Sequence, residues 1–373
     1  MFASSAAQRQ CLVFRVPAAS PADMSGVARL MDDGRVRAEE ILAIFGKTEG
    51  NGCVNDFTRG YAVDCLKLLF AARLDLPPDE AERRIAMIMS GGTEGGLSPH
   101  FLVFAVTEQS PLSATGHNKA LAIGRAATRR FLPEEIGRMA QVEATADAVR
   151  QCIDVAGIDE VHFVQIKCPL LTAERIAEAS ARRCTTVTDG TYASMGYSRG
   201  ASALGTALAL GEVDQAALSD EVIGRNANLW SARASISAGV ELLHNEIIVL
   251  GNSETWSGSL TIAHAVMQDA LDAGAVRAAL EGVGIAVKTQ IAPADQERLL
   301  AVLVKAEPSR SGTIRGLRHI MGDDSDINAT RHARALVGGV VGGVIGRTDL
   351  FVSGGAEHQG PDGGGPIAVI ASR

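Results

Sequence analysis

The chain has 373 residues, of which 46% are hydrophobic and 21% charged, and its formal net charge is −8. This composition is typical of a globular protein with a large core, and the length favours two or three units. The acidic balance argues against nucleic-acid binding. The six cysteines include no CxxC pair, which argues against a disulfide or zinc framework. No apolar stretch reaches 18 residues, which argues against a membrane span.

The first predicted unit, residues 1–107, opens with a strand over 11–16. A second apolar run, "ILAIFGK", ends at Lys47, and a helical segment follows that carries Arg59 in "NDFTRGYAV". The next apolar run ends in a glycine-rich turn, "MIMSGGTEGG", which contains Ser90, and "FLVFAV" over 101–106 completes the unit. On its own, such a serine turn predicts only a loop.

The same series recurs in residues 118–251, after the linker "TEQSPLSATGHN". A strand over 119–124 precedes a helical pattern over 139–157, and "VHFVQIK" ends at Lys167. Arg199 follows in "MGYSRGASA", then Ser237 in "ARASISAGVE", and "EIIVLG" closes the unit. Here alanine, Ala238, stands where the other two serine turns have glycine.

The third predicted unit, residues 256–373, repeats the order once more. A strand over 259–266 comes first, "LLAVLVK" ends at Lys305, and "NATRHARAL" carries Arg331. The segment "ALVGGVVGGVIG" predicts a closely packed helix, because its glycines recur every four residues. "LFVSGGAEHQGP" then supplies Ser353 and Gly354 before the last strand-like run, "PIAVIA".

The order Lys, Arg, Ser three times in one chain predicts an α/β protein of three homologous repeats around a pseudo-threefold axis. We expect the strands to form a central barrel-like core with helices outside. Taken singly, each lysine is typical of a solvated strand end and each arginine of a helix surface. Repetition favours one shared site, to which each unit contributes a lysine, an arginine and a serine.

These residue types indicate acyl transfer. Serine is a weak nucleophile until a base takes its proton, and a buried lysine near other cations can be that base. The glycines allow backbone N–H groups to approach an oxyanion. Three planar guanidinium groups suit a small, flat ring with carbonyls on several sides. A pseudo-threefold binding protein that only holds such a ligand is the alternative.

Six longer segments resemble the cyanuric acid amidohydrolase/barbiturase family over nearly the whole chain. They are "FGKTEGNGCVNDFTRGYA", "MSGGTEGGLSPH", "HFVQIKCPLLT", "SMGYSRGASALG", "SDINATRHARA" and "VSGGAEHQGPDGGGP". The resemblance implies ring opening of cyanuric acid to carboxybiuret, and then biuret and carbon dioxide, by serine–lysine catalysis. Barbituric acid, hydrolysed to ureidomalonate, is the alternative substrate within the family.

The resemblance also implies roles for individual residues. Ser237 would be the nucleophile and Lys167 its base. The substrate-binding residues would be Lys47, Arg59, Ser90, Gly91, Arg199, Ala238, Lys305, Arg331, Ser353 and Gly354. A structural cation, magnesium or calcium, would be bound by Glu307, Ala356, Gln359, Gly360, Pro361 and Gly364; a glycine turn without metal is the alternative for that loop. No catalytic cofactor is expected.

For partners, the same resemblance implies a small cyclic imide or amide substrate and a homo-oligomer, a tetramer as in the family. The N-terminal residues "MFASSAAQRQ" have neither a basic region nor an apolar core of the signal-peptide kind. We therefore expect a cytoplasmic protein that contacts neither nucleic acid nor membrane.

Overall fold

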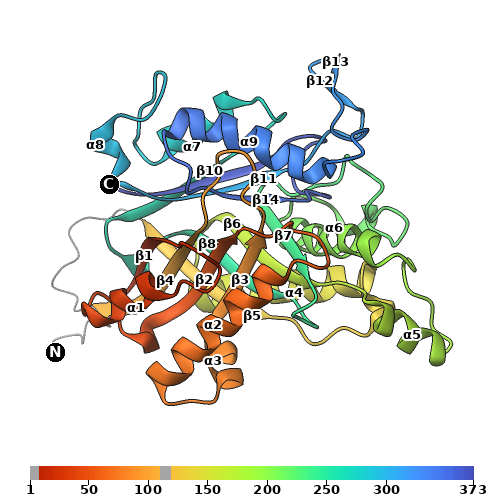
Figure 1. The fold of residues 1–373 in the computed structure, drawn as a ribbon, viewed down its shortest axis with the longest axis horizontal. Coiled ribbons are helices and arrows are strands. Elements are labelled where there is room, and N and C mark those ends of the chain that lie inside the picture. The colour runs from red at the N-terminus through yellow and green to blue at the C-terminus, as the bar shows by residue number, and fades with distance from the viewer. Residues whose placement is uncertain (1–7, 110–118) are drawn as a thin grey trace.

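The computed structural model describes residues 8–109 and 119–373, and in this part the chain forms three main sheets with helices outside them (Figure 1). The predicted α/β class is confirmed. The linker expected over 107–118 falls almost entirely outside the described residues. No closed barrel is found in the described ranges, because the strands divide between separate sheets instead of joining into one ring.

The first sheet has the strand order β3-β2-β4-β1-β9. Its strands are β1 (Gln8–Pro17), β2 (Ile41–Thr48), β3 (Ala86–Gly91), β4 (His100–Gln109) and β9 (Trp256–Ser257). The helices of this region are α1 (Ser25–Asp32), α2 (Phe57–Leu74) and α3 (Pro78–Arg84). Helix α2 begins where the Asp56 side chain accepts a hydrogen bond from the Thr58 amide, a typical N-cap.

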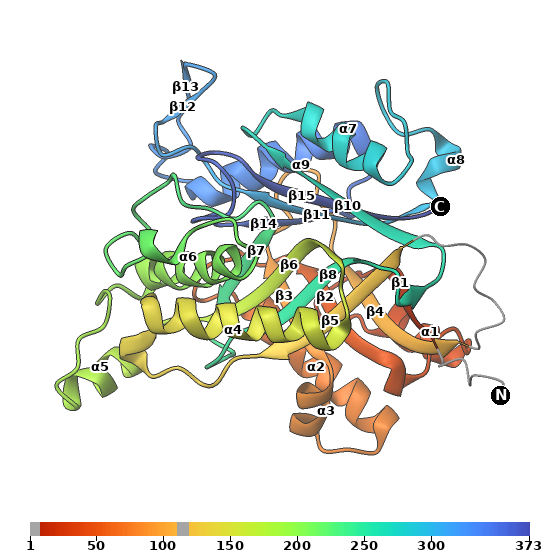
Figure 2. The same ribbon diagram turned by 180° about the vertical axis from the view of Figure 1, so that it is seen from behind.

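The second sheet has the order β5-β8-β6-β7. It comprises β5 (Ala120–Ala127), β6 (Glu160–Pro169), β7 (Ala234–Gly239) and β8 (Glu246–Ser253). Its helices are α4 (Met139–Ala156), α5 (Ala173–Ala181) and α6 (Thr191–Ala209). Figure 2 shows α4 and α6 lying side by side against this sheet.

The third sheet has the order β10-β15-β11-β14. It comprises β10 (Leu260–Met267), β11 (Leu299–Ala306), β14 (Phe351–Gly354) and β15 (Gly365–Ser372), with a small hairpin of β12 (Thr313–Ile314) and β13 (Leu317–Arg318). Its helices are α7 (Ala273–Gly282), α8 (Pro293–Gln296) and α9 (Ala329–Ile345), and α7 and α9 lie above the sheet in Figure 1.

In each sheet, two neighbouring parallel strands are joined through a long helix. The pairs are β2 and β3 through α2, β6 and β7 through α6, and β11 and β14 through α9. A parallel pair needs such a crossover, and the crossover places the carboxyl ends of both strands at the same edge of the sheet. The lysine and serine strands of each sheet therefore end side by side.

The inner faces of the three sheets share one hydrophobic core. Phe45 and Phe104 of the first sheet, Phe163 of the second and Phe351 of the third all belong to it and are fully buried. A separate apolar cluster lies between the third sheet and α7 and α9, and another between the first sheet and its helices. Each sheet is thus covered on both faces, which explains why its strands read as nearly continuous apolar runs.

The segment between the second and third sheets adds a strand to the first. Trp256 of β9 pairs with Arg9 of β1, and Ser257 pairs with Gln10. The Trp256 ring is buried, its indole N–H donates to the Ala156 carbonyl, and the Arg9 guanidinium lies 4.7 Å from its centroid. This short segment therefore ties the first sheet to helix α4, which packs on the second. Within the described residues, no helix is both long enough and apolar enough to cross a membrane.

Candidate active site

The three serines lie at the ends of their strands and face one another. Ser90 lies in β3, Ser237 in β7 and Ser353 in β14, and all three are buried. Ser237 Oγ is 3.0 Å from Ser353 Oγ. Residues up to 263 positions apart in the sequence thus meet at the junction of the three sheets.

Each lysine stands directly beside its serine on the neighbouring parallel strand. The register pairs Lys47 with Ser90, and it pairs Lys167 and Lys305 with the serines of their own sheets. All three ammonium side chains are only 1% exposed. Lys47 Nζ donates to Ser90 Oγ at 3.4 Å, and Lys305 Nζ donates to Ser353 Oγ at 3.2 Å. Hydrogen-bonded serine–lysine pairs are thus present in the first and third sheets.

Two of the lysines also reach across to another sheet. Lys167 Nζ donates to the carbonyl of Met89, the residue before the serine of the first sheet, at 2.9 Å. Lys305 Nζ donates to the carbonyl of Ile236, the residue before the serine of the second sheet, at 2.7 Å. The sheets are therefore linked through the lysines themselves.

Burial shifts the three lysines toward the neutral form. It lowers the pKa of Lys305 to about 7, with Arg199 adding to the effect. Burial and the charge of Arg334 hold the pKa of Lys47 well below its ordinary value. Burial also lowers the pKa of Lys167, but the Glu241 carboxylate opposes this shift. Amines with a lowered pKa can accept a proton near neutral pH, which ordinary lysines do not.

The arginines form the wall of the same site, but in the third sheet the residue differs from the one expected. Arg59 and Arg199 line the cavity. From α9, Arg334 lines it, whereas the side chain of Arg331 is 41% exposed. Arg334 is one helical turn further along and only 3% exposed.

Two of the arginines are bound by glutamates of the serine turns. Arg199 donates through Nε and Nη2 to both oxygens of Glu357 at 2.7 Å. Arg334 makes the same two-point contact with Glu94, with Nε 2.8 Å from Oε2. Such planar pairs fix the guanidinium in position and orientation. These two glutamates were visible in the sequence as the last residue of each serine turn, but the sequence assigns them no partner.

The cavity enclosed by these residues is small, with about 260 Å³ of empty volume. That volume includes space open to solvent, so the site favours a small ligand. Its lining consists of Gly52, Arg59, Ser90, Gly91, Met195, Arg199, Ser237, Ala238, Arg334, Ser353 and Gly354. Met195 is the one large apolar side chain among them, and the sequence contained no signal for it.

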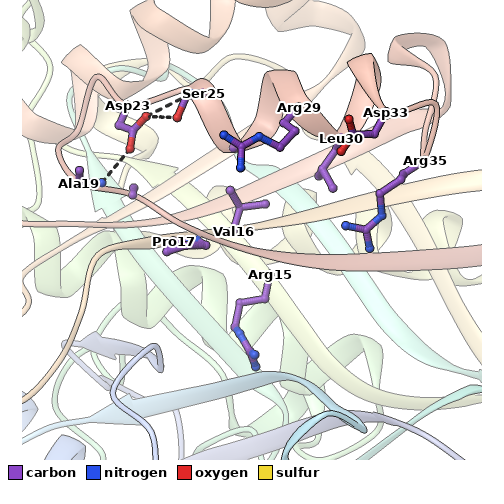
Figure 3. A pocket seen from close by; sticks show the side chains of 12 residues that line it. Arg15, Val16, Pro17, Ala19, Asp23, Ser25, Arg29, Leu30, Asp33 and Arg35 are labelled. Carbon is purple, nitrogen blue, oxygen red and sulfur yellow. Dashed lines mark hydrogen bonds between the residues drawn. The ribbon is translucent and has the colours of Figure 1, made fainter.

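A roomier hollow, with about 950 Å³ of empty volume, lies elsewhere, between β1 and α1 (Figure 3). Arg29 and Arg35 lie on the α1 side of β1 beside Val16 and Leu30, whereas the Arg15 side chain points away from α1 toward the third sheet. It contains none of the three serines and three lysines of the strand pairs, and Arg15 is already paired with Asp349 at 2.6 Å. Because the three serines line the small cavity and each lysine is paired with one of them, we assign the chemistry there.

The glycine-rich loop before β15 surrounds a buried carboxylate. Glu307 Oε2 accepts a hydrogen bond from the Ala356 amide at 3.0 Å, and burial and the nearby Glu357 charge raise the pKa of Glu307 to about 7. Ala356, Gly360 and Pro361 line a pocket with it. A carboxylate that is costly to bury as an anion is a fitting ligand for a cation.

The other expected ligands can contribute only main-chain oxygens. The side chain of Gln359 is engaged within the protein, because its Oε1 accepts from the Ile236 amide and its Nε2 donates to the Gly355 carbonyl. The Pro361 carbonyl accepts from the Gly364 amide. Among the described residues, no three His, Cys, Asp or Glu side chains gather as metal ligands. One carboxylate with backbone carbonyls suits a hard cation and not zinc.

Comparison with known proteins gives a consistent result. The family model of amidohydrolase ring-opening proteins matches residues 12–372. A cyanuric acid amidohydrolase of Enterobacter cloacae is 56% identical over 366 residues, which are 97% of this chain and 99% of the relative. Another, of Ectopseudomonas oleovorans (strain CECT 5344), is 57% identical over 361 residues, covering 96% of this chain and 98% of the relative.

Solved structures agree with these relatives. A cyanuric acid hydrolase structure superposes with a TM-score of 0.94 at 51% identity, covering 98% of this chain and 100% of the other. The crystal structure of the A. caulinodans enzyme gives a TM-score of 0.89 at 56% identity, covering 98% and 99%. The chain is a hydrolase and belongs to the family of ring-opening amidohydrolases.

Proposed function

We propose that this protein hydrolyses cyanuric acid to carboxybiuret, which loses carbon dioxide to form biuret. The observation that carries the proposal is the meeting of three serine–lysine strand pairs at one small cavity, which the three serines line together with Arg59, Arg199 and Arg334. Cyanuric acid presents three equivalent carbonyls, and such a site offers each of them a similar set of donors. The names of the close relatives support the same substrate.

We infer that residues 1–107, 118–251 and 256–373 are three repeats about a pseudo-threefold axis. The support is the common strand order, in which the serine strand is followed by the lysine strand, the last strand and the first strand of each unit. The contacts between units also follow a common rule: Lys167 and Lys305 each donate to the carbonyl before another unit's serine. A pseudo-threefold axis would pass through the cavity.

In the mechanism we propose, Ser237 Oγ attacks a ring carbonyl carbon while its proton passes to Lys167 Nζ. The ring C–N bond then breaks, and the leaving nitrogen takes that proton from the ammonium. Water hydrolyses the resulting ester, which releases carboxybiuret and restores the serine hydroxyl. The lowered pKa of Lys167 favours the neutral amine that the first step requires.

The remaining residues would bind and polarise the other two sides of the ring. Lys47 with Ser90, and Lys305 with Ser353, would donate to ring oxygens, while Arg59, Arg199 and Arg334 would fix the plane of the ring. Arg334 takes the place expected for Arg331, because Arg334 lines the cavity and Arg331 does not. Backbone amides at Gly91, Ala238 and Gly354 would donate hydrogen bonds to the oxygen on which negative charge develops.

A structural cation belongs to the same proposal. Glu307 and the main-chain oxygens of Ala356, Gln359, Gly360, Pro361 and Gly364 would hold magnesium or calcium. The buried Glu307 carboxylate supports this, because a bound cation would neutralise a charge that burial otherwise disfavours. Such an ion would stiffen the loop that follows Ser353, and no step of the reaction depends on it.

We also infer a homo-oligomer, a tetramer as in the family. Phe57, Tyr61 and Leu68 along α2 are 82%, 56% and 64% exposed, and a row of large apolar side chains on one helix is typical of a surface covered by another subunit. Light scattering of the purified protein measures the assembly directly.

The test is to incubate the purified protein with cyanuric acid and, separately, with barbituric acid, and to follow ring loss and biuret formation. We expect cyanuric acid to be consumed and Ser237→Ala to lose about 10⁴-fold or more in turnover. Ser235→Ala, two residues earlier on β7, is the matched control and should retain activity. Saturable binding without product would indicate a binding protein, and consumption of barbituric acid alone would reassign the substrate. An active Ser237→Ala alongside an inactive Ser90→Ala would contradict the assignment of the nucleophile.

A further inference from the structure

The three serine turns are alike in sequence, but the glutamate of the second turn has a different partner. Glu94 and Glu357 each hold an arginine through both oxygens. Glu241, at the same position of the second turn, instead forms an ion pair with Lys167, with Oε1 2.8 Å from Nζ. The pseudo-threefold arrangement is broken at this point.

The backbone of the second turn differs in the same place. Gly92 and Gly355 have φ of +103° and +80°, and an added Cβ would lie within 2.7 Å of the guanidinium of Arg334 or Arg199. The equivalent Gly239 is still part of β7, which runs one residue further than the other serine strands. Its added Cβ would lie 2.0 Å from Glu241 Oε2. The longer strand therefore brings a carboxylate to the place that an arginine takes in the other two turns.

Arg59 does not compete for this carboxylate, because its guanidinium is used elsewhere. Nη1 donates to the Ala238 carbonyl at 3.0 Å and Nη2 to the Cys53 carbonyl at 2.7 Å, while Asp56 lies 3.7 Å from Nε. Glu241 therefore pairs with Lys167. Its own side chain is 17% exposed.

We propose that Glu241 is a positioning residue that makes Ser237, Lys167 and Glu241 a triad, and that this triad selects the second of the three serine–lysine pairs as the reacting one. The inference rests on the proposed function and adds a third member to its mechanism. When Lys167 Nζ takes the Ser237 proton, an ammonium forms, and the adjacent carboxylate stabilises that charge and holds the amine in place. The same logic applies to the aspartate that orients the histidine of a Ser-His-Asp triad.

The electrostatics agree with this role. Burial pushes the pKa of Glu241 upward, but Lys167 and Arg59 outweigh burial and lower it to about 2, so the carboxylate is ionised throughout the working range. Lys47 and Lys305 form no such ion pair with the glutamate of their own serine turn, because Glu94 and Glu357 are bound to arginines. The ammonium that acyl transfer generates is therefore accommodated better at Lys167 than at Lys47 or Lys305.

The experiment compares Glu241→Gln with Glu94→Gln, a matched loss of one carboxylate at the equivalent position of the first turn. For each full-length variant, kcat and KM for cyanuric acid are measured across pH. We expect Glu241→Gln to lose about 10²-fold or more in kcat with KM changed less than about threefold. Because the carboxylate favours the ammonium form, its removal should also move the acid limb of the kcat profile to lower pH. Glu94→Gln should raise KM, since it loosens Arg334, and should leave the acid limb where it is.

Glu241→Asp provides a second test should the glutamine variant fail to fold. Its carboxylate is one methylene further from Lys167, so the acid limb should shift in the same direction by less, with a smaller loss of kcat. Wild-type kcat and an unmoved acid limb in either Glu241 variant would overturn the triad, as would an equal shift in Glu94→Gln. A wild-type enzyme that leaves cyanuric acid intact would instead overturn the proposed function.

Discussion

Replacing Arg334 with methionine should be far more damaging than the same change at Arg331, three residues earlier on α9. Arg334 is 3% exposed, and the Glu94 side chain, 14% exposed, would lose its two-point partner. Breaking a buried ion pair by removing one partner costs roughly 3–5 kcal/mol. Arg331 Nε lies 3.4 Å from Glu94 and compensates in part, so we expect about 3 kcal/mol, or about a hundredfold in the folded-to-unfolded ratio.

At Arg331 the same substitution should cost about 1 kcal/mol or less, because the side chain is 41% exposed and its ion pair is screened by water. Denaturant unfolding and kcat/KM for cyanuric acid measure both variants. Adding Glu94→Gln to Arg334→Met removes the uncompensated charge, so it should restore most of the stability but not the activity, which we expect to remain down about 10²-fold or more. A larger loss of stability and activity in Arg331→Met than in Arg334→Met would refute this reasoning.

Three further changes probe the base, the loop and an internal histidine pair. Lys167→Arg should show no turnover at any pH, because guanidinium does not deprotonate, whereas the wild-type rate should rise with pH as Lys167 becomes neutral; near wild-type turnover in this variant would remove lysine from the base role. Dialysis against a chelator should lower the melting temperature more than the initial rate at moderate temperature, because the proposed ion at Glu307 only supports a loop; an immediate loss of turnover that only zinc restores would contradict this. His264, whose Nδ1 is 2.8 Å from His162 Nδ1, has its pKa lowered from 6.5 to about 4 by burial and by His162. Since the folded form disfavours protonation there, stability should be lost as the pH falls from 6.5 toward 4, and His264→Gln should flatten that loss in acid unfolding curves; an unchanged pH dependence would contradict it.

The strands that carry the site could be predicted from the sequence because local pattern is sufficient for them. Continuous apolar runs that end in Lys47 or Lys167 predict buried strands, and the glycines after Ser90 predict a turn. The helix over "ALVGGVVGGVIG" was also predicted and is confirmed as part of α9. An added Cβ at Gly338 would lie 2.9 Å from Leu97, which is the close packing that the glycine spacing indicated.

The choice between Arg331 and Arg334 could not be made from sequence. Both lie on the same helix within "TRHAR", and a preceding threonine favoured the first because Arg59 has one too. What decides between them is the position of Glu94, some 240 residues away in the chain. The ion pair of Glu241 with Lys167 was equally out of reach, since it depends on one extra residue of strand in β7. The expected barrel-like closure is likewise a long-range property that strand patterns do not encode.

Strand β9 bears on how the chain could be divided. It consists of Trp256 and Ser257 only, in the stretch between β8 and β10, yet it completes the edge of a sheet whose other strands all precede residue 110. If the chain were divided between Ser253 and Trp256, every unit would keep its lysine, arginine and serine. The N-terminal polypeptide would nevertheless lose β9, the edge strand of the first sheet, to the C-terminal one. Heating or denaturant should accordingly produce one cooperative transition and not a stepwise loss of modules. We therefore expect the chain to unfold as a single body.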